Sequence, residues 1–316
     1  MLKAMSRTAA VVSVAIVLAA TSGCGGSTTG PTADTTSTES TSAGAPTKMA
    51  LMVASLTTDF FVQIEAAAQA YATEKGIELS VFTADNDAAK ELSNMEDILS
   101  EDFDVILLTP VDSDAAVASV EMANAAGVPV VTFDRGVSGG EVVSHIASDN
   151  EAGGKMAAEY IAGRFPDGGN VVELQGILAT DVAKERGAGF GAGLAEAGNL
   201  ELVAQQSANF DKAQGFTVFE NILQANDQID AVFAANDEMA LGAMQAAEAA
   251  NRTDIVIVGF DASAEAVAAV QAGQMAATIA QLPDKIVQTA IDTALSYLAG
   301  ETVEPEIRVE LQLVTK

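Results

Sequence analysis

Short apolar runs alternate with amphipathic stretches from residue 48 onward. The runs predict strands at MALMVASL (49–56), IELSVFTAD (77–85), DVILLTP (104–110) and VPVVTFD (128–134). Between them, apolar residues recur at helical spacing in residues 60–76, 88–103 and 114–127, and Gly76 stands where a C-cap glycine is expected. Strands that alternate with helices of this length indicate a parallel α/β sheet covered on both faces.

The second half of the chain repeats the pattern of the first. Strands are predicted at GNVVELQG (169–176), LELVAQQSANF (200–210), DAVFAANDE (230–238) and IVIVGFD (255–261), and helices at residues 184–198, 215–226 and 238–251. The segment FDVILLTPVD, which begins at residue 103, has its counterpart about 125 residues later in IDAVFAANDE. We therefore expect two similar parallel-sheet lobes that arose by duplication.

Chemically distinctive residues stand where the predicted strands end. They are residues 56–61, Thr109, Asp134, Arg135, Asn236, Phe260 and Asp261. Open parallel sheets bind ligands beyond the carboxyl ends of their strands, and two such edges facing each other would form a cleft. Successive side chains of an extended chain point to opposite faces, so Asp134 and Arg135 are expected not to neutralise each other.

The N-terminus has the pattern of a lipoprotein signal peptide. Lys3 and Arg7 precede an uncharged apolar stretch that is too short to span a bilayer comfortably, and this stretch ends at Thr21-Ser22-Gly23-Cys24. We predict a signal peptide over 1–24 with lipidation of Cys24, although Thr21 replaces the usual aliphatic residue and ordinary secretory cleavage is the alternative. Residues 25–47, rich in Ser, Thr, Gly and Pro, are predicted to be a disordered tether. The expected location is extracytoplasmic and lipid-anchored to the cell membrane, or periplasmic without the lipid.

Composition excludes several classes of function. A net charge of −29 repels nucleic acid and anionic membranes, so no nucleic-acid partner is expected, and membrane contact is expected only through the lipid anchor. The chain has one His, His145, and one Cys, so multi-imidazole metal sites and His- or Cys-based triads are not available. The glycines of ERGAGFGAG do not form the dinucleotide fingerprint. We predict neither a metal nor a cofactor.

The strand-end residues are suited to a neutral sugar. Carboxylates accept hydrogen bonds, guanidinium groups donate them, amides do both, and each sugar hydroxyl also does both. Asp134 and Asp261 could form the carboxylate pair of a glycoside-processing enzyme, which is the remote alternative. Their matching places in the two halves favour a ligand clamp, so we predict a protein that is not an enzyme.

From Lys48 to the C-terminus the sequence resembles the periplasmic ribose-binding proteins of bacterial ABC sugar importers. The resemblance lies in DFFVQIE, AKELSNMEDIL, VVSHIASDN, VELQGI, ERGAGF, ANFD, NDEMALGA, IVGFD and TIAQLPD. It implies a periplasmic binding protein type I fold, in which a hinge of three segments joins two α/β lobes. It also implies an N-terminal sugar-binding lobe of residues 48–148 plus 282–310 and a C-terminal lobe of residues 149–281 plus 311–316.

The same resemblance assigns roles to individual residues. Phe60, Phe61 and Phe210 are expected to sandwich the sugar ring, and Phe260 to line the same wall. The sugar hydroxyls are expected to bind Asp134 and Arg135 from one lobe, Arg186, Asn236 and Asp261 from the other, and Gln281 from the hinge.

Three departures from the family pattern bear on specificity. The family has Asn where this chain has Thr58 and Thr109, and Ser where it has Ala54. A hydroxyl is shorter than an amide and has one donor fewer, so Thr58 and Thr109 are expected to tune specificity. Ribose, another pentose, a ketose and a polyol all remain open as ligands.

The resemblance also implies partners. They are a monosaccharide and an ABC permease with its ATPase, and the protein itself is expected to be a monomer. A sensor that presents sugar to a membrane receptor or chemoreceptor is the alternative, because it would use the same binding site. Repressors of related fold carry a DNA-binding head, and this chain has a signal peptide and a tether in that place.

Overall fold

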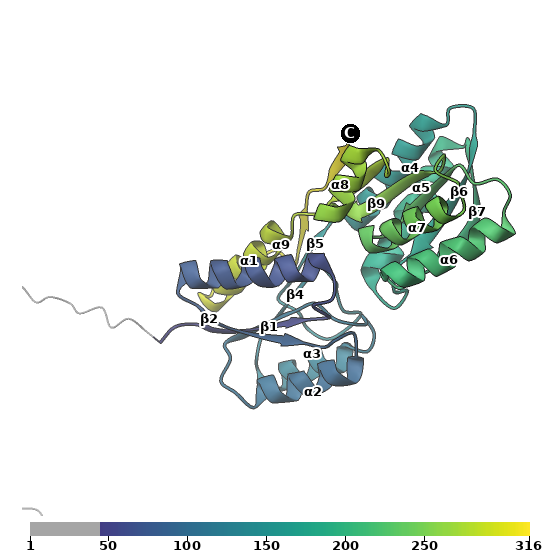
Figure 1. Cartoon of the computed structure of the whole chain (residues 1–316). Helices are drawn as coiled ribbons and strands as arrows, with labels where there is room; N and C mark the ends of the chain where they lie inside the picture. Colours follow the sequence, from purple (N-terminus) through teal and green to yellow (C-terminus); the bar gives the residue numbers. More distant parts are fainter. Residues whose placement is uncertain (1–44) are drawn as a thin grey trace, which may run out of the picture. The chain divides into compact units, whose positions relative to one another are not determined.

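The computed structural model describes residues 45–316, which form one compact unit containing two six-stranded sheets (Figure 1). The first sheet has the order β11-β5-β4-β3-β1-β2, and all its pairings are parallel. Its strands are β1 (Lys48–Val53), β2 (Glu78–Thr83), β3 (Val105–Leu108), β4 (Val130–Phe133), β5 (Ser144–Ser148) and β11 (Glu306–Val309).

The second sheet has the order β12-β10-β9-β8-β6-β7, which repeats the topology of the first. Its strands are β6 (Gly169–Gln175), β7 (Leu200–Ser207), β8 (Ala231–Ala234), β9 (Val256–Asp261), β10 (Ala277–Ala280) and β12 (Gln312–Thr315). Only its edge strand β12 departs from the predicted parallel arrangement, because it pairs antiparallel with β10. The predicted pair of similar α/β lobes is confirmed.

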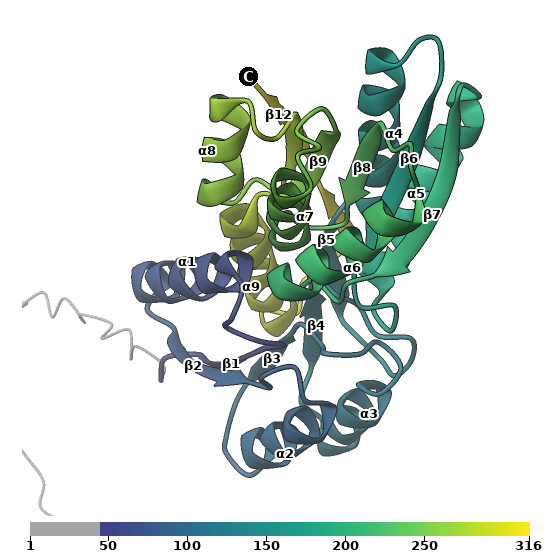
Figure 2. The same cartoon turned by 45° about the vertical axis from the view of Figure 1, so that its right-hand side comes forward.

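Helices cover both faces of each sheet (Figure 2). The first sheet carries α1 (Asp59–Lys75) and α9 (Pro283–Leu298) on one face, and α2 (Ala88–Leu99) and α3 (Val117–Ala126) on the other. The second sheet packs against α4 (Asn150–Arg164), α5 (Asp181–Ala197), α6 (Lys212–Ala225), α7 (Asp237–Ala249) and α8 (Ala264–Ala272). Gly76 caps α1 with a left-handed φ of 70°, as predicted.

The alternation of side chains along a strand explains why the central strands are continuous apolar runs. In β1, Met49 and Leu51 join the apolar cluster under α1 and α9, whereas Ala50 and Met52 join the cluster under α2 and α3. All four are completely buried. A strand covered on both faces therefore has no polar position to reveal its period.

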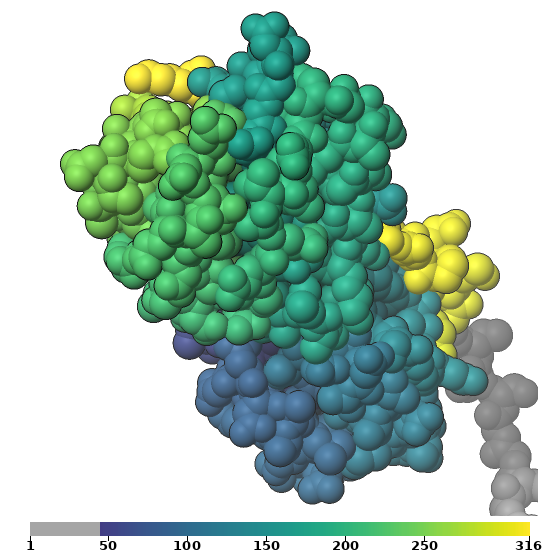
Figure 3. Space-filling model, turned by 90° about the vertical axis from the view of Figure 1, so that its right-hand side faces the viewer, coloured from purple at the N-terminus to yellow at the C-terminus, as the bar shows by residue number. Residues whose placement is uncertain are grey.

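The chain crosses between the two sheets three times, after β5, after β10 and after β11. Because of these crossings, the C-terminal residues, drawn in yellow in Figure 3, reach the surface at two separate places. The exact lobe boundaries stay a prediction. Among residues 45–316, no helix combines the length and apolarity needed to cross a membrane. The signal peptide, Cys24 and most of the tether lie outside the described residues.

Candidate functional site

The carboxyl ends of strands from both sheets border one small cavity. The space free of atoms, including solvent at its mouth, is about 340 Å³. Its lining residues are Thr58, Phe60, Phe61, Asp134, Arg135, Val182, Arg186, Phe210, Asn236, Asp261 and Gln281. The structure thus brings together all nine residues that the family resemblance proposed as ligand contacts.

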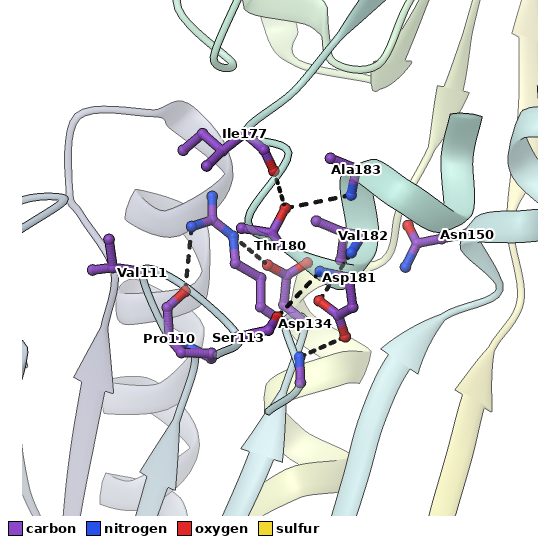
Figure 4. A network of polar contacts seen from close by, with 12 residues as sticks. Pro110, Val111, Ser113, Asp134, Asn150, Ile177, Thr180, Asp181, Val182 and Ala183 are labelled. Carbon is purple, nitrogen blue, oxygen red and sulfur yellow. Dashed lines mark hydrogen bonds and ion pairs between the residues drawn. The ribbon is translucent and has the colours of Figure 1, made fainter. Parts of the chain in front are cut away.

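Asp134 and Arg135 follow β4 and lie on the same side of the chain. Asp134 has a left-handed φ of 58°, so the backbone leaves the extended conformation at this residue. Arg135 Nε lies 3.9 Å from Asp134 Oδ2, and Arg135 Nη1 donates to Pro110 O at 3.3 Å (Figure 4). The prediction that the two side chains point to opposite faces is wrong, because it assumed that the strand continued through Asp134.

These two charged side chains are buried but incompletely paired. No described residue donates a hydrogen bond to the Asp134 carboxylate, and Arg135 Nε has no hydrogen-bond partner in the described part of the chain. Burial raises the pKa of Asp134 to about 6, against the opposing effect of Arg135 and Arg186. Burial lowers the pKa of Arg135. Both groups therefore have hydrogen-bonding capacity that the described residues do not use.

Arg186 is held firmly on the other side of the cavity. Its Nε donates to Asn150 Oδ1 at 2.8 Å, its Nη1 donates to Ala235 O at 2.6 Å, and its guanidinium lies 3.8 Å from the centre of the Phe260 ring. Phe260 is completely buried and is not a lining residue, so it supports Arg186 from behind rather than lining the wall.

Asp261 ends β9 in another uncommon backbone conformation, with φ at 114°. Gln281 Nε2 donates to Asp261 Oδ1 at 2.8 Å, and Arg186 Nη1 lies 3.8 Å from the same oxygen. Burial raises the pKa of Asp261 to about 7, while Arg186 opposes the shift. Gln281 Oε1 also accepts from Ser148 Oγ at 2.7 Å, so this amide bridges the ends of β5 and β9.

Aromatic rings complete the walls. Phe60 and Phe61 meet edge to face with ring centres 5.3 Å apart. The Arg135 guanidinium lies 5.3 Å from the centre of the Phe61 ring and 5.6 Å from that of Phe210. Whether these rings sandwich a sugar stays a prediction, but they supply apolar surface beside the polar groups.

Asn236 has a structural role as well as its place in the cavity lining. Its Oδ1 accepts from Met239 N at 3.0 Å and caps α7, and its Nδ2 donates to Phe210 O at 3.3 Å. Thr58 lines the cavity and makes no capping hydrogen bond to α1. Thr109 is completely buried, lies outside the lining, and its hydroxyl has no partner among the described residues.

Sequence reasoning missed three residues at or near the site. Val182 lines the cavity, Asn150 fixes Arg186, and Asp181 lies one residue before Val182 at the start of α5. No motif or strand end in the sequence marks Val182, and Asn150 ends the segment VVSHIASDN, to which no role in the site was assigned. Asp181 could have been noticed as an acidic residue in the first turn of a helix.

Comparison with known proteins agrees with this geometry. Residues 49–302 match the family described as periplasmic binding protein domain. The chain is 46% identical over 279 residues to the ribose import binding protein RbsB of Escherichia coli (strain K12), covering 88% of this chain and 94% of that protein.

Two solved structures share the whole architecture. A periplasmic solute-binding protein of an ABC transporter from Actinobacillus succinogenes 130z with bound D-allose matches with a TM-score of 0.81 and 31% identity, covering 85% of this chain and 98% of that one. The Caulobacter myo-inositol-binding protein bound to myo-inositol matches with a TM-score of 0.82 and 29% identity, covering 86% of this chain and 94% of that one. The chain belongs to the periplasmic binding protein family.

Proposed function

We propose that this protein is the extracytoplasmic substrate-binding protein of an ABC-type importer and that it binds a neutral monosaccharide or polyol in the cavity. The observation that carries the proposal is the set of unsatisfied groups there. The Asp134 carboxylate receives no hydrogen bond from the described residues, and Arg135 Nε donates none. A ligand hydroxyl can donate to the carboxylate and accept from the guanidinium at once.

Charge balance supports a neutral ligand. The lining contains two carboxylates, Asp134 and Asp261, and two guanidinium groups, Arg135 and Arg186. When all four are ionised their charges cancel, so the lining favours neither an anion nor a cation. The relatives agree with this chemistry, since one is named for ribose and the two solved structures hold D-allose and myo-inositol. Thr58, which lines the cavity, is the residue that we propose tunes specificity, and Thr109 would act only indirectly.

Delivery to a permease and its ATPase, lipidation of Cys24 and a monomeric state are parts of the same proposal. The family supports transport. The lining contains neither His nor Cys, so the pair Asp134 and Asp261 is what the remote alternative of a glycoside-processing enzyme would use. We infer that ligand binding closes the lobes and that the closed form is delivered to the permease. Presentation of the ligand to a chemoreceptor stays the alternative.

A thermal-shift screen against D-ribose, other pentoses, hexoses and myo-inositol tests the proposal. A ligand with a dissociation constant of about 1 μM, present at about 1 mM, would stabilise the protein by about 4 kcal/mol, which is readily detected. Calorimetry on the strongest ligand then gives the affinity. We expect Asp134→Ala to abolish binding because it removes an acceptor of ligand hydroxyls.

Asp230→Ala is the matched control, since Asp230 accepts a backbone hydrogen bond within the second lobe and does not line the cavity. Absence of any shift in the wild type would refute the proposed function. Unchanged affinity in Asp134→Ala would refute the site.

A further inference from the structure

Asp181 connects the two lobes with a single carboxylate. Its Oδ1 accepts from Val182 N at 2.9 Å within α5, and its Oδ2 accepts from Gly136 N at 2.7 Å in the loop after β4 (Figure 4). Gly136 directly follows Arg135, and Val182 lines the cavity. The contact therefore joins the two ligand-lining segments without taking part in the lining itself.

Two further hydrogen bonds reinforce this connection. Ser113, in the loop after β3, accepts through Oγ from Asp181 N at 3.2 Å and donates through its backbone N to Ala179 O at 3.1 Å. Ser138 N donates to Ser113 O at 2.9 Å, so the loops after β3 and β4 approach α5 together. We name the set Ser113, Gly136, Ala179 and Asp181 the interlobe tie.

The close approach depends on the absence of a side chain at Gly136. A Cβ there would lie 2.7 Å from Asp181 Oδ2 and 3.3 Å from His145 Cε1. His145 Nε2 itself lies 3.9 Å from Asp181 Oδ2, and its Nδ1 lies 3.0 Å from Thr132 Oγ1. The sole histidine thus borders the tie.

We propose that the interlobe tie stabilises the closed arrangement of the lobes, and that Asp181 is a positioning residue which raises ligand affinity without contacting the ligand. The apparent affinity of a two-state binding protein scales with the fraction of molecules in the competent state. Hydrogen bonds made only on closure increase that fraction and slow ligand release. This inference rests on the proposed function, since it concerns the same site.

The test compares Asp181→Ala and Gly136→Ala with Asp181→Asn. The ligand is whichever of D-ribose, D-allose and myo-inositol gives the largest thermal shift with the wild type. Loss of one such hydrogen bond should weaken affinity by between about twofold and about tenfold, mainly through faster dissociation. Gly136→Ala should act in the same direction while leaving α5 intact. Asp181→Asn can keep an oxygen acceptor for Gly136 N but then gives up the local bond from Val182 N within α5, so it should retain more of the affinity than Asp181→Ala.

Asp230→Ala is again the control, because Asp230 Oδ2 accepts from Asn170 N at the same distance of 2.7 Å, with both groups in the second lobe. It should lower the melting temperature and leave affinity unchanged. If Asp181→Ala and Gly136→Ala also lose only stability, the tie is merely structural and the proposal is overturned.

X-ray scattering of the ligand-free proteins provides a readout that needs no ligand. A larger radius of gyration in Asp181→Ala than in the wild type supports the tie, as does lost affinity. If the wild type binds none of the three sugars, the proposed function fails for them. The scattering comparison then decides alone, because an unchanged radius overturns the tie.

Discussion

At the scale of single residues, the cavity holds two aspartates in strained positions. Asp134 and Asp261 both have positive φ, at 58° and 114°. Asp134 is buried and Asp261 is half-buried, and each lies beside an arginine. Such conformations are costly and tend to occur at functional sites, where the surrounding structure enforces them. The same burial raises the pKa of these carboxyls to about 6 and about 7, so both titrate near neutral pH.

This leads to a prediction for pH dependence. Ionised carboxylates form stronger hydrogen bonds with hydroxyls than neutral carboxyls do, so ligand binding should lower both pKa values and release protons. We expect sugar affinity to rise by about tenfold or more from pH 5 to pH 8 and then to level off. Calorimetry in buffers of different ionisation enthalpy measures both the affinity and the proton release.

The stability of the ligand-free protein should show the opposite trend for these two groups. Because their folded-state pKa values are raised, their contribution to stability is full below about pH 4 and is lost as pH rises through 6 and 7. Asp261→Asn should remove the part of the pH dependence that is centred near pH 7, both for sugar affinity and for the stability of the ligand-free protein. An affinity that is flat across this range, or proton uptake on binding, would contradict the assignment.

The apolar runs reveal strand ends, and these predicted part of the cavity lining, including Asp134, Asn236 and Asp261. Other lining residues, namely Arg186, Phe210 and Gln281, were expected only from the family resemblance. The sequence could not predict how Asp134 and Arg135 point, since that depends on one left-handed φ at the end of β4. It also placed Thr109 and Thr58 together, although only Thr58 reaches the cavity. Side-chain direction at a turn is set by backbone dihedrals that an apolar pattern does not encode.

At the scale of elements, the pattern revealed the strands with large apolar residues and missed those without them. Helix α4 was not predicted because most of its buried positions hold small residues, namely Gly153, Gly154, Ala157 and Ala158, and Ile161 is its one large apolar residue among them. Strand β5 reads SHIAS, and the edge strands β11 and β12 are largely exposed. Small buried residues and half-covered edges give no clear apolar period.

The glycines of ERGAGFGAG have a packing role in the structure. A Cβ at Gly189 would lie 1.9 Å from Glu151 O in α4, so α4 and α5 can approach closely only with glycine at this position. That approach brings Asn150, the first residue of α4, to Arg186 in α5. The segment therefore serves to position an arginine, in agreement with its lack of a dinucleotide fingerprint.

The turn between β9 and α8 is a second element with a buried support. Asp237 Oδ2 accepts from Ser263 N and its Oδ1 accepts from Thr278 Oγ1, both at 2.7 Å, while Thr278 Oγ1 accepts from Ala262 N at 3.2 Å. Asp261 and Ala262 both have positive φ in this turn. Asp237, the first residue of α7, thus holds the conformation that presents Asp261 to the cavity.

We therefore expect Asp237→Asn to weaken sugar binding by about tenfold, because its amide cannot accept both hydrogen bonds and the unpaired donor costs about 1–3 kcal/mol. Calorimetry measures the affinity, and a double-mutant cycle with Asp261→Asn tests whether the effect acts through Asp261. Glu173→Gln is the control, since Glu173 is equally buried in the same lobe and accepts a hydrogen bond from Gln205 Nε2. Fully additive effects in the cycle would show that Asp237 supports the fold and not Asp261 in particular.

At the scale of the whole molecule, the internal repeat was the strongest signal. Matching segments about 125 residues apart predicted two similar lobes, and the strand orders of the two sheets are the same. This repeat places equivalent strand ends, and hence Asp134 and Asp261, at equivalent edges of the two sheets. The assignment of β11 and β12 to different sheets could not be derived from pattern alone, because each is a short edge strand.

The last prediction concerns the proposed attachment to the membrane through Cys24, which lies outside the described residues. An acyl chain contributes about 0.8 kcal/mol per buried methylene, and stable anchoring requires more than one chain or a polybasic patch. With a net charge of −29, the protein should depend on lipid alone. We expect Cys24→Ser to abolish fatty-acid labelling and to move the protein from the membrane fraction to the soluble fraction.

Ser22→Ala is the matched control, because it keeps a small residue before the cysteine and should retain both the label and the membrane location. Sugar affinity should be the same in all three proteins, since the cavity is built only from residues 58–281. Continued labelling of Cys24→Ser would refute the lipid anchor. An unlabelled wild type would instead favour ordinary secretory cleavage, with the sugar site unaffected.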